Sequence, residues 1–238
     1  MVSNKLDRKF LFWGIESIGE GWIAIVSSTY LAMFMTDIAL IPLGLVSGAM
    51  LVMSISDFIF ATTSGAVISM IRPKRWGRLR SYLLICPPIT AIFYIIHFIS
   101  IPKNTVLTTL IITVGFIVAK LLYNLVYTAN VSLITIIARD QKAKNRLSSQ
   151  RMIGSNVGRM LGNYLTPVIV LAASASVSER ALYPLIMVGV GVVYILTNLI
   201  HFALSKGYET AGETIQVKRD GDTLSLKTII SLLSKNHQ

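Results

Sequence analysis

The chain has 238 residues, of which 53% are apolar and only 14% are charged, with a mean hydropathy of +0.66. Soluble domains contain roughly 25% charged residues, so this composition excludes a soluble globular protein. The net charge of +11 comes from short basic clusters between apolar stretches, which favours a membrane topology signal over a nucleic-acid-binding face. A single cysteine, Cys86, excludes an internal disulfide and a cysteine-based metal cluster.

Apolar stretches long enough to cross a bilayer as helices recur along the chain. Lipid admits only helices and closed barrels as spanning structures, and these stretches have helical length. We therefore predict an all-α membrane protein with six transmembrane helices. The predicted spans are residues 10–35, 41–70, 82–101, 105–137, 152–174 and 181–204.

Basic residues alternate along the connections between these spans. Three precede the first span and none lies in 36–43, whereas five lie between Arg72 and Arg80. Five more lie between Arg139 and Arg151, and five in the tail. The positive-inside rule then predicts a multi-pass protein of the cell membrane with both termini in the cytoplasm.

Charged residues inside a span are costly and are functional hypotheses by default. Asp57 has the most central position, where a carboxylate could bind Na⁺ or take up a proton. The alternative is a structural ion pair with Lys120 or Arg159. Glu16 and Glu20 share one helical face and could hold a cation or bind sugar hydroxyls, or Glu16 could meet a cytoplasmic arginine.

The fourth span carries a polar stripe with a spacing of three and four residues, which places its members on one helical face. Aromatic rings cover sugar CH groups and amides bind hydroxyls, so the stripe suits a polyhydroxylated ligand. Hydrogen bonding between helices is the alternative. The members of the stripe are Lys120, Tyr123, Asn124, Tyr127 and Asn130.

Glycines recur every fourth residue at Gly154, Gly158 and Gly162, which predicts close approach of another helix. Gly44 and Gly48 suggest a second such contact. Phosphate-cradling loops, Ser-His-Asp sets and metal-spaced clusters are absent from the sequence, so an enzyme, a metal site and a bound cofactor are not predicted.

Several segments in order resemble the glycoside-pentoside-hexuronide:cation symporters, the melibiose-permease branch of the major facilitator superfamily. The similarity covers essentially the whole chain. The segments are Arg72-Pro-Lys-Arg-Trp-Gly-Arg-Leu-Arg80, Thr36-Asp37 followed by Asp57, Asn145-Arg-Leu-Ser-Ser-Gln-Arg-Met152, and Leu224-Ser-Leu-Lys-Thr with Lys235-Asn236.

This resemblance implies a fold of two six-helix bundles that bind a sugar and Na⁺ or H⁺ between them during alternating access. The chain would supply the N-terminal bundle as residues 1–204, and 205–238 would resemble the central cytoplasmic loop. The second bundle would be a C-terminal half or a second copy of the chain. The implied function is symport of a sugar or glycoside with a cation; the alternative is a noncatalytic membrane subunit or a truncated transporter remnant.

The resemblance also implies roles for individual residues. Asp57 keeps the first acid of the family's cation motif, although Ala61 and Thr62 replace the rest, and Arg151 matches an arginine near the cation site or gate. The substrate-side candidates are Glu20, Asn124, Tyr127 and Lys120. The expected cytoplasmic gate comprises Arg72, Arg75, Trp76, Gly77 and Arg78.

Overall fold

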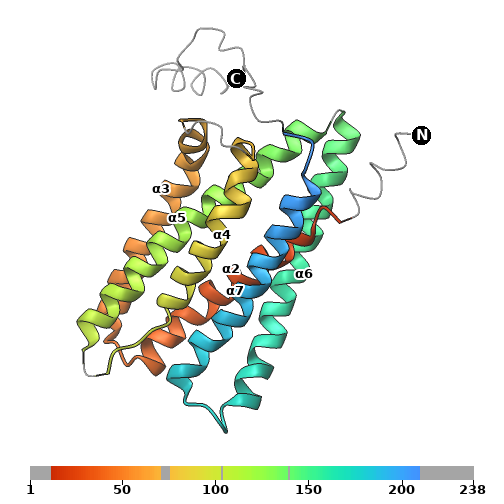
Figure 1. The fold of residues 1–238 in the computed structure, drawn as a ribbon. Helices are drawn as coiled ribbons and strands as arrows, with labels where there is room; N and C mark the ends of the chain where they lie inside the picture. Colours follow the sequence, from red (N-terminus) through yellow and green to blue (C-terminus); the bar gives the residue numbers. More distant parts are fainter. Residues whose placement is uncertain (1–11, 71–75, 103, 139, 210–238) are drawn as a thin grey trace, which may run out of the picture.

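The computed structural model describes residues 12–70, 76–102, 104–138 and 140–209, and this part of the chain is helical throughout its regular structure. Consecutive long helices run in alternating directions (Figure 1). The six-helix, all-α prediction is therefore confirmed. The elements are α2 (Ile15–Met33), η1 (Phe34–Ile38), α3 (Leu43–Met70), α4 (Arg78–Ile96), α5 (Thr105–Ile137), α6 (Gln141–Ala173) and α7 (Glu179–Leu204).

Side-chain caps fix where two of the long helices begin. Asn104 accepts a hydrogen bond from the Leu107 backbone N–H at 2.9 Å, so α5 begins where its apolar pattern begins. Asp140 accepts one from the Ala143 N–H at 2.6 Å and starts α6 at Gln141. The helix of the span predicted for residues 152–174 thus begins earlier than the span itself, because the polar residues before it form three further helical turns.

The other boundaries differ less from the expectation. The helix of the third predicted span, α4, begins at Arg78 rather than at residue 82. The last residues of the basic connection before it are therefore helical. The first span ends in the π-helical turn η1, in which Thr36 donates to the Asp37 carboxylate at 2.6 Å. The predicted tail beyond Glu209 and the N-terminal basic residues lie outside the described residues.

The helices pack in the spatial order α6, α2, α7, α4, α5, α3. Each inner helix contacts a neighbour on either side, whereas α3 packs mainly on α5 and α6 mainly on α2. The two edge helices, α3 and α6, consequently expose many apolar side chains, among them Leu51, Phe58 and Tyr164. Figure 1 shows α3 and α6 on opposite flanks of the bundle.

Glycines bring α2 and α6 together, as the spacing of Gly154, Gly158 and Gly162 predicts. A Cβ atom at Gly154 would collide with the Gly14 carbonyl, and one at Gly158 with the Ile18 carbonyl. The expected second contact at Gly44 and Gly48 is not made within the described residues, because open space surrounds both positions on the edge helix α3.

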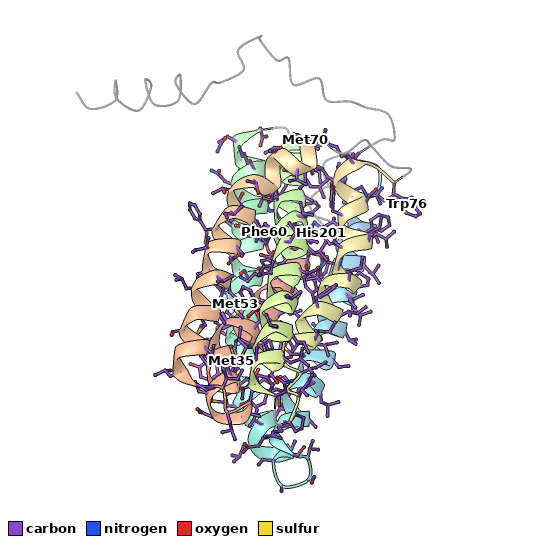
Figure 2. All side chains as sticks on the ribbon, turned by 90° about the vertical axis from the view of Figure 1, so that its left-hand side faces the viewer. Met35, Met53, Phe60, Met70, Trp76 and His201 are labelled. Carbon is purple, nitrogen blue, oxygen red and sulfur yellow. The ribbon has the colours of Figure 1, made fainter. Side chains whose placement is uncertain are left out.

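The buried apolar side chains form two clusters, one toward each end of the bundle. One contains Phe34, Met35 and Tyr183, and the other contains Trp13, Leu83 and Leu133. Figure 2 shows Met35 in the lower half of the bundle, Met53 near its middle, and Met70 and Trp76 toward the upper end. The buried polar side chains of α2 and α5 belong to neither cluster.

Five of the helical segments are long and apolar enough to cross a membrane: Ile15–Ile38, α3, α4, α5 and α7. The sixth, α6, is more polar because its first turns carry Lys142, Lys144 and Arg146. Its 33 residues extend over about 50 Å, longer than a hydrocarbon core of about 30 Å. Its polar first turns can therefore lie outside the membrane while its remainder spans it.

Candidate functional site

All five side chains of the polar stripe on α5 contact polar or charged groups of other helices or of α5 itself. The α2 and α5 backbones have few close contacts, and Tyr123 and Asn130 bridge the space between them. The stripe divides into two groups, one directed at α3 and the other at α2 and α6.

The first group surrounds Asp57 on α3. Lys120 Nζ donates to Asp57 Oδ2 at 3.0 Å, and Asn124 Nδ2 donates to Oδ1 at 2.9 Å. The Asp57 side chain remains 35% exposed, whereas the Lys120 side chain is 14% exposed. Lys120 also lies 5.5 Å from the ring centroids of Phe116 and Tyr123. The carboxylate of Asp57 thus faces two donors and has an internal cation as its counter-charge.

The second group centres on Arg151 of α6. Its Nη2 donates to both carboxylate oxygens of Glu20, at 3.1 and 3.2 Å, and Tyr123 Oη donates to Oε1 of the same carboxylate at 3.2 Å. The guanidinium lies 4.1 Å from the ring centroid of Tyr127, which is 40% exposed. A largely buried ion pair therefore stacks on the ring of a partly exposed tyrosine.

Glu16 lies one helical turn before Glu20 and is fully buried. Its Oε2 accepts hydrogen bonds from Ser17 Oγ and from the Asn130 side-chain amide. Its Oε1 and the Asn130 side-chain oxygen have no partner among the described residues. Glu16 therefore lacks the direct ion pair that Glu20 makes.

The structure shows which partner each of these charged residues has. Asp57 pairs with Lys120, while Arg159 is exposed on the outer face of α6. The arginine that binds an acid of α2 is Arg151, and it binds Glu20 rather than Glu16. Arg151 and Asp57, expected together at a cation site, belong to different groups, which Lys120 and Tyr123 connect.

The expected gate is only partly described, because Arg72 and Arg75 lie outside the described residues. Trp76 is 45% exposed, and Gly77 has a φ of +94°, which favours glycine. Arg78 begins α4, and its backbone N–H donates to the Glu209 carboxylate at 2.9 Å.

Glu209 and Arg80 are two residues of this region that the sequence did not single out. The Glu209 carboxylate also accepts from the backbone N–H groups of Leu79 and Arg80, so a residue beyond α7 caps α4. Arg80 Nε donates to Ser205 Oγ at 3.1 Å, and its guanidinium stacks on Phe202 at 4.4 Å. The only sequence signal for these contacts of Glu209 and Arg80 is that the basic loop leads directly into the start of a helix, α4.

A family model described as MFS/sugar transport protein matches residues 12–235. The chain belongs to this family. It is thus a multi-pass membrane protein of the major facilitator superfamily with a sugar transporter domain, and its six helices fit the N-terminal bundle of that fold. In this sugar transporter domain, the groups around Asp57 and Arg151 each contain an ion pair that connects two helices.

The donor sets of these clusters differ from those of a metal centre. Among residues 12–70, 76–102, 104–138 and 140–209, His, Cys, Asp and Glu form no group of three that could hold a metal ion.

Proposed function

We propose that the chain is a sugar:cation symporter half that works by alternating access with a second six-helix bundle. The observation that carries the proposal is the Arg151–Glu20 ion pair resting on the partly exposed Tyr127 ring. In this proposal residues 1–204 form the transmembrane bundle and 205–238 form a cytoplasmic tail. Both termini lie on the cytoplasmic side of the cell membrane.

The substrate is a sugar, glycoside or related polyhydroxylated compound. Tyr127 offers an aromatic face for sugar CH groups, and Arg151 and Glu20 offer a donor and an acceptor for hydroxyls beside it. Asn124 and Lys120 lie on the same face of α5 and extend the polar surface toward Asp57.

The proposed cation site is Asp57, with Na⁺ or H⁺ as the coupling ion. Lys120 occupies one carboxylate oxygen, so a cation arriving at Asp57 displaces the ammonium or competes with it. A released Lys120 would lie beside Tyr123, whose hydroxyl contacts Glu20. Cation binding at Asp57 would then change the charge next to the sugar-binding residues, which provides a direct route for coupling.

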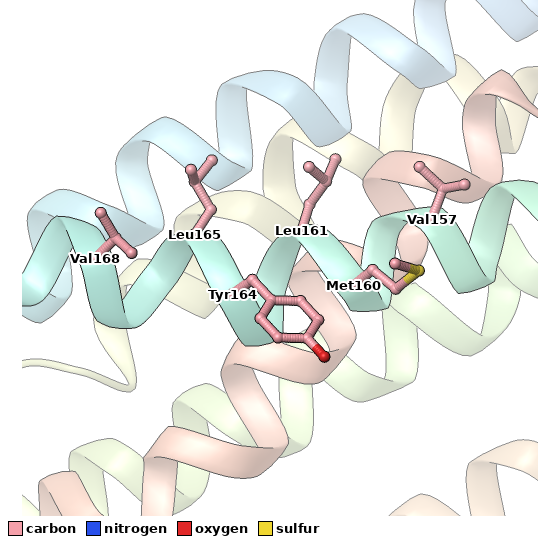
Figure 3. Close-up of a pocket in the computed structure, with 6 residues that line it drawn as sticks. All are labelled: Val157, Met160, Leu161, Tyr164, Leu165 and Val168. Carbon is pink, nitrogen blue, oxygen red and sulfur yellow. The ribbon is translucent and has the colours of Figure 1, made fainter.

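The proposed second bundle packs on the edge helices α3 and α6. On α6 an open apolar groove of about 420 Å³ is lined by Val157, Met160, Leu161, Tyr164, Leu165 and Val168 (Figure 3). Tyr164 and Met160 are 73% and 59% exposed. The second bundle would be a C-terminal half or another copy of this chain.

A noncatalytic membrane subunit is the second candidate, and the Asp57–Lys120 ion pair favours it. Both Asp57 oxygens have partners within the chain, as expected of a structural pair between helices. The two candidates differ in whether these residues respond to substrate or cation.

Uptake of labelled glycosides and pentosides into proteoliposomes that contain the full chain tests the proposal. Uptake that depends on an imposed Na⁺ or H⁺ gradient and is lost in Tyr127→Ala supports it. The matched control is Leu196→Ala, an exposed side chain of α7 that lies outside both the polar stripe and the proposed bundle interface. If well-folded protein gives no uptake, with or without six further helices supplied as a separate chain, the noncatalytic role is favoured.

A further inference from the structure

Two buried acids and one arginine meet near the start of α2, and their charges do not balance. Glu16 is fully buried and Glu20 is 4% exposed. Arg151 forms an ion pair with Glu20. Two carboxylates with one guanidinium would leave a net negative charge away from water. Burial of an uncompensated charge is so costly that a carboxyl in this position binds a proton instead.

The hydrogen bonds indicate which of the two acids holds the proton. Arg151 and Tyr123 donate three hydrogen bonds to Glu20, a pattern that stabilises an ionised carboxylate. Glu16 has only neutral donors, Ser17 and Asn130. Its second oxygen and the Asn130 side-chain oxygen both lack a donor. A proton on Glu16 removes its charge and gives the carboxyl group a donor of its own.

Within the part of the chain that the structure describes, Arg151 is the cation that acts on Glu16. Glu16 lies on α2, and α5, α6 and α7 surround it. Their side chains include Tyr123 and Tyr194, which are neutral hydrogen-bond donors or acceptors. His201 of α7 lies against Trp13 with a centroid distance of 4.2 Å, and its electrostatic partner is Arg151. The titratable groups that face Glu16 within the described residues are Glu20, Tyr123, Arg151 and Tyr194.

We propose that Glu16 is a proton-binding site whose occupancy is coupled to the Arg151–Glu20 ion pair. While Arg151 binds Glu20, the proton resides on Glu16. When Arg151 moves to Glu16, the O–H bond of Glu16 breaks and the proton passes to the Glu20 carboxylate or to water. The site is distinct from Asp57, which has its own counter-charge in Lys120.

Infrared spectroscopy of the full chain in lipid vesicles tests the protonation of Glu16 without a transport assay. The chain is labelled with ¹³C-glutamate, which shifts glutamic acid carbonyl bands and leaves those of Asp57 in place. At neutral pH we expect a band of one protonated glutamic acid in the wild type. Its absence overturns the proposal without the need for any variant.

Three variants assign the band and test the coupling. Glu16→Gln is close in shape to the protonated acid and is expected to remove the band. The control Glu179→Gln changes an exposed glutamate and is expected to leave the band unchanged. Glu20→Gln leaves Arg151 free to pair with Glu16, so the band should disappear. Persistence of the band in Glu16→Gln overturns the site, and persistence in Glu20→Gln overturns the coupling. Because no sugar is involved, these outcomes are separate from failure of the proposed transport.

Discussion

Lys120 Nζ lies 3.0 Å from Asp57 Oδ2, so the central acid of α3 is neutralised by a lysine of α5. Asn124 completes the coordination of the carboxylate from the same face of α5. The ion pair connects Asp57, the charged residue with the most central position in a predicted span, to the polar stripe of α5. It also means that any external cation at Asp57 must compete with a tethered ammonium.

Removal of either partner of this pair tests its role. Asp57→Asn is expected to abolish any cation dependence of uptake, while Lys120→Met should increase the apparent affinity for the coupling cation. Each single variant should lower the free energy of unfolding by roughly 1–3 kcal/mol, between the values for exposed and buried pairs. Uptake at graded cation concentrations and thermal unfolding in detergent measure the two effects.

The double variant Asp57→Asn/Lys120→Met provides the control for this comparison. If the pair is purely structural, the double variant should lose less unfolding free energy than the two single variants lose together. The cation dependence of uptake should then be unchanged in all three variants. Unchanged coupling in Asp57→Asn would remove Asp57 from the mechanism.

Substitutions of Arg151 should separate its charge from its planar shape. Arg151→Gln leaves Glu20 buried without a cation, which is expected to cost about 3–5 kcal/mol of unfolding free energy. Arg151→Lys keeps the charge but loses stacking on Tyr127, so it should retain more stability and still weaken sugar binding. Thermal unfolding and binding of a labelled glycoside distinguish the two.

A matched control lies on the same helix, because Arg159 is exposed. Arg159→Gln should change the unfolding free energy by no more than about 0.5 kcal/mol. Equal effects at Arg151 and Arg159 would contradict the assigned role of Arg151.

The glycine contact between α2 and α6 predicts opposite effects for the same substitution at two helical sites. Gly158→Ala drives a methyl group into the Ile18 carbonyl and should destabilise the bundle by about 1–3 kcal/mol. Gly48→Ala adds a methyl group in open space and should be neutral or stabilising by up to about 1 kcal/mol, because alanine favours helix. Denaturation midpoints in one detergent compare them. Similar losses at both positions would argue against the close approach.

The Glu209 cap predicts a graded series at the start of α4. Glu209→Ala removes the acceptor for three backbone N–H groups and should cost about 1–2 kcal/mol. Glu209→Gln keeps one acceptor oxygen and should have a smaller effect. Hydrogen exchange at Arg78, Leu79 and Arg80 reports on the cap directly. Unaltered exchange in Glu209→Ala would show that the contact contributes nothing.

The sequence by itself determined the number and kind of helices and the face that carries polar residues. Apolar length and a spacing of three and four residues are local properties, so the start of α5 at Thr105 and the stripe from Lys120 to Asn130 could be predicted. The packing role of Gly158 could be predicted for the same reason. Hydropathy alone could not locate the start of α6, because Asp140 caps a helix whose first turns consist of polar residues.

Only the tertiary structure decided which charges meet. The choice of Lys120 over Arg159 by Asp57 depends on α3 packing on α5, which spacing along one helix does not encode. The same holds for Glu20 with Arg151, where the glycine contact brings α6 against α2. Gly48 faces open space because its helix is at an edge of the bundle. Partner choice is thus a property of helix adjacency, whereas helix formation is a property of the local sequence.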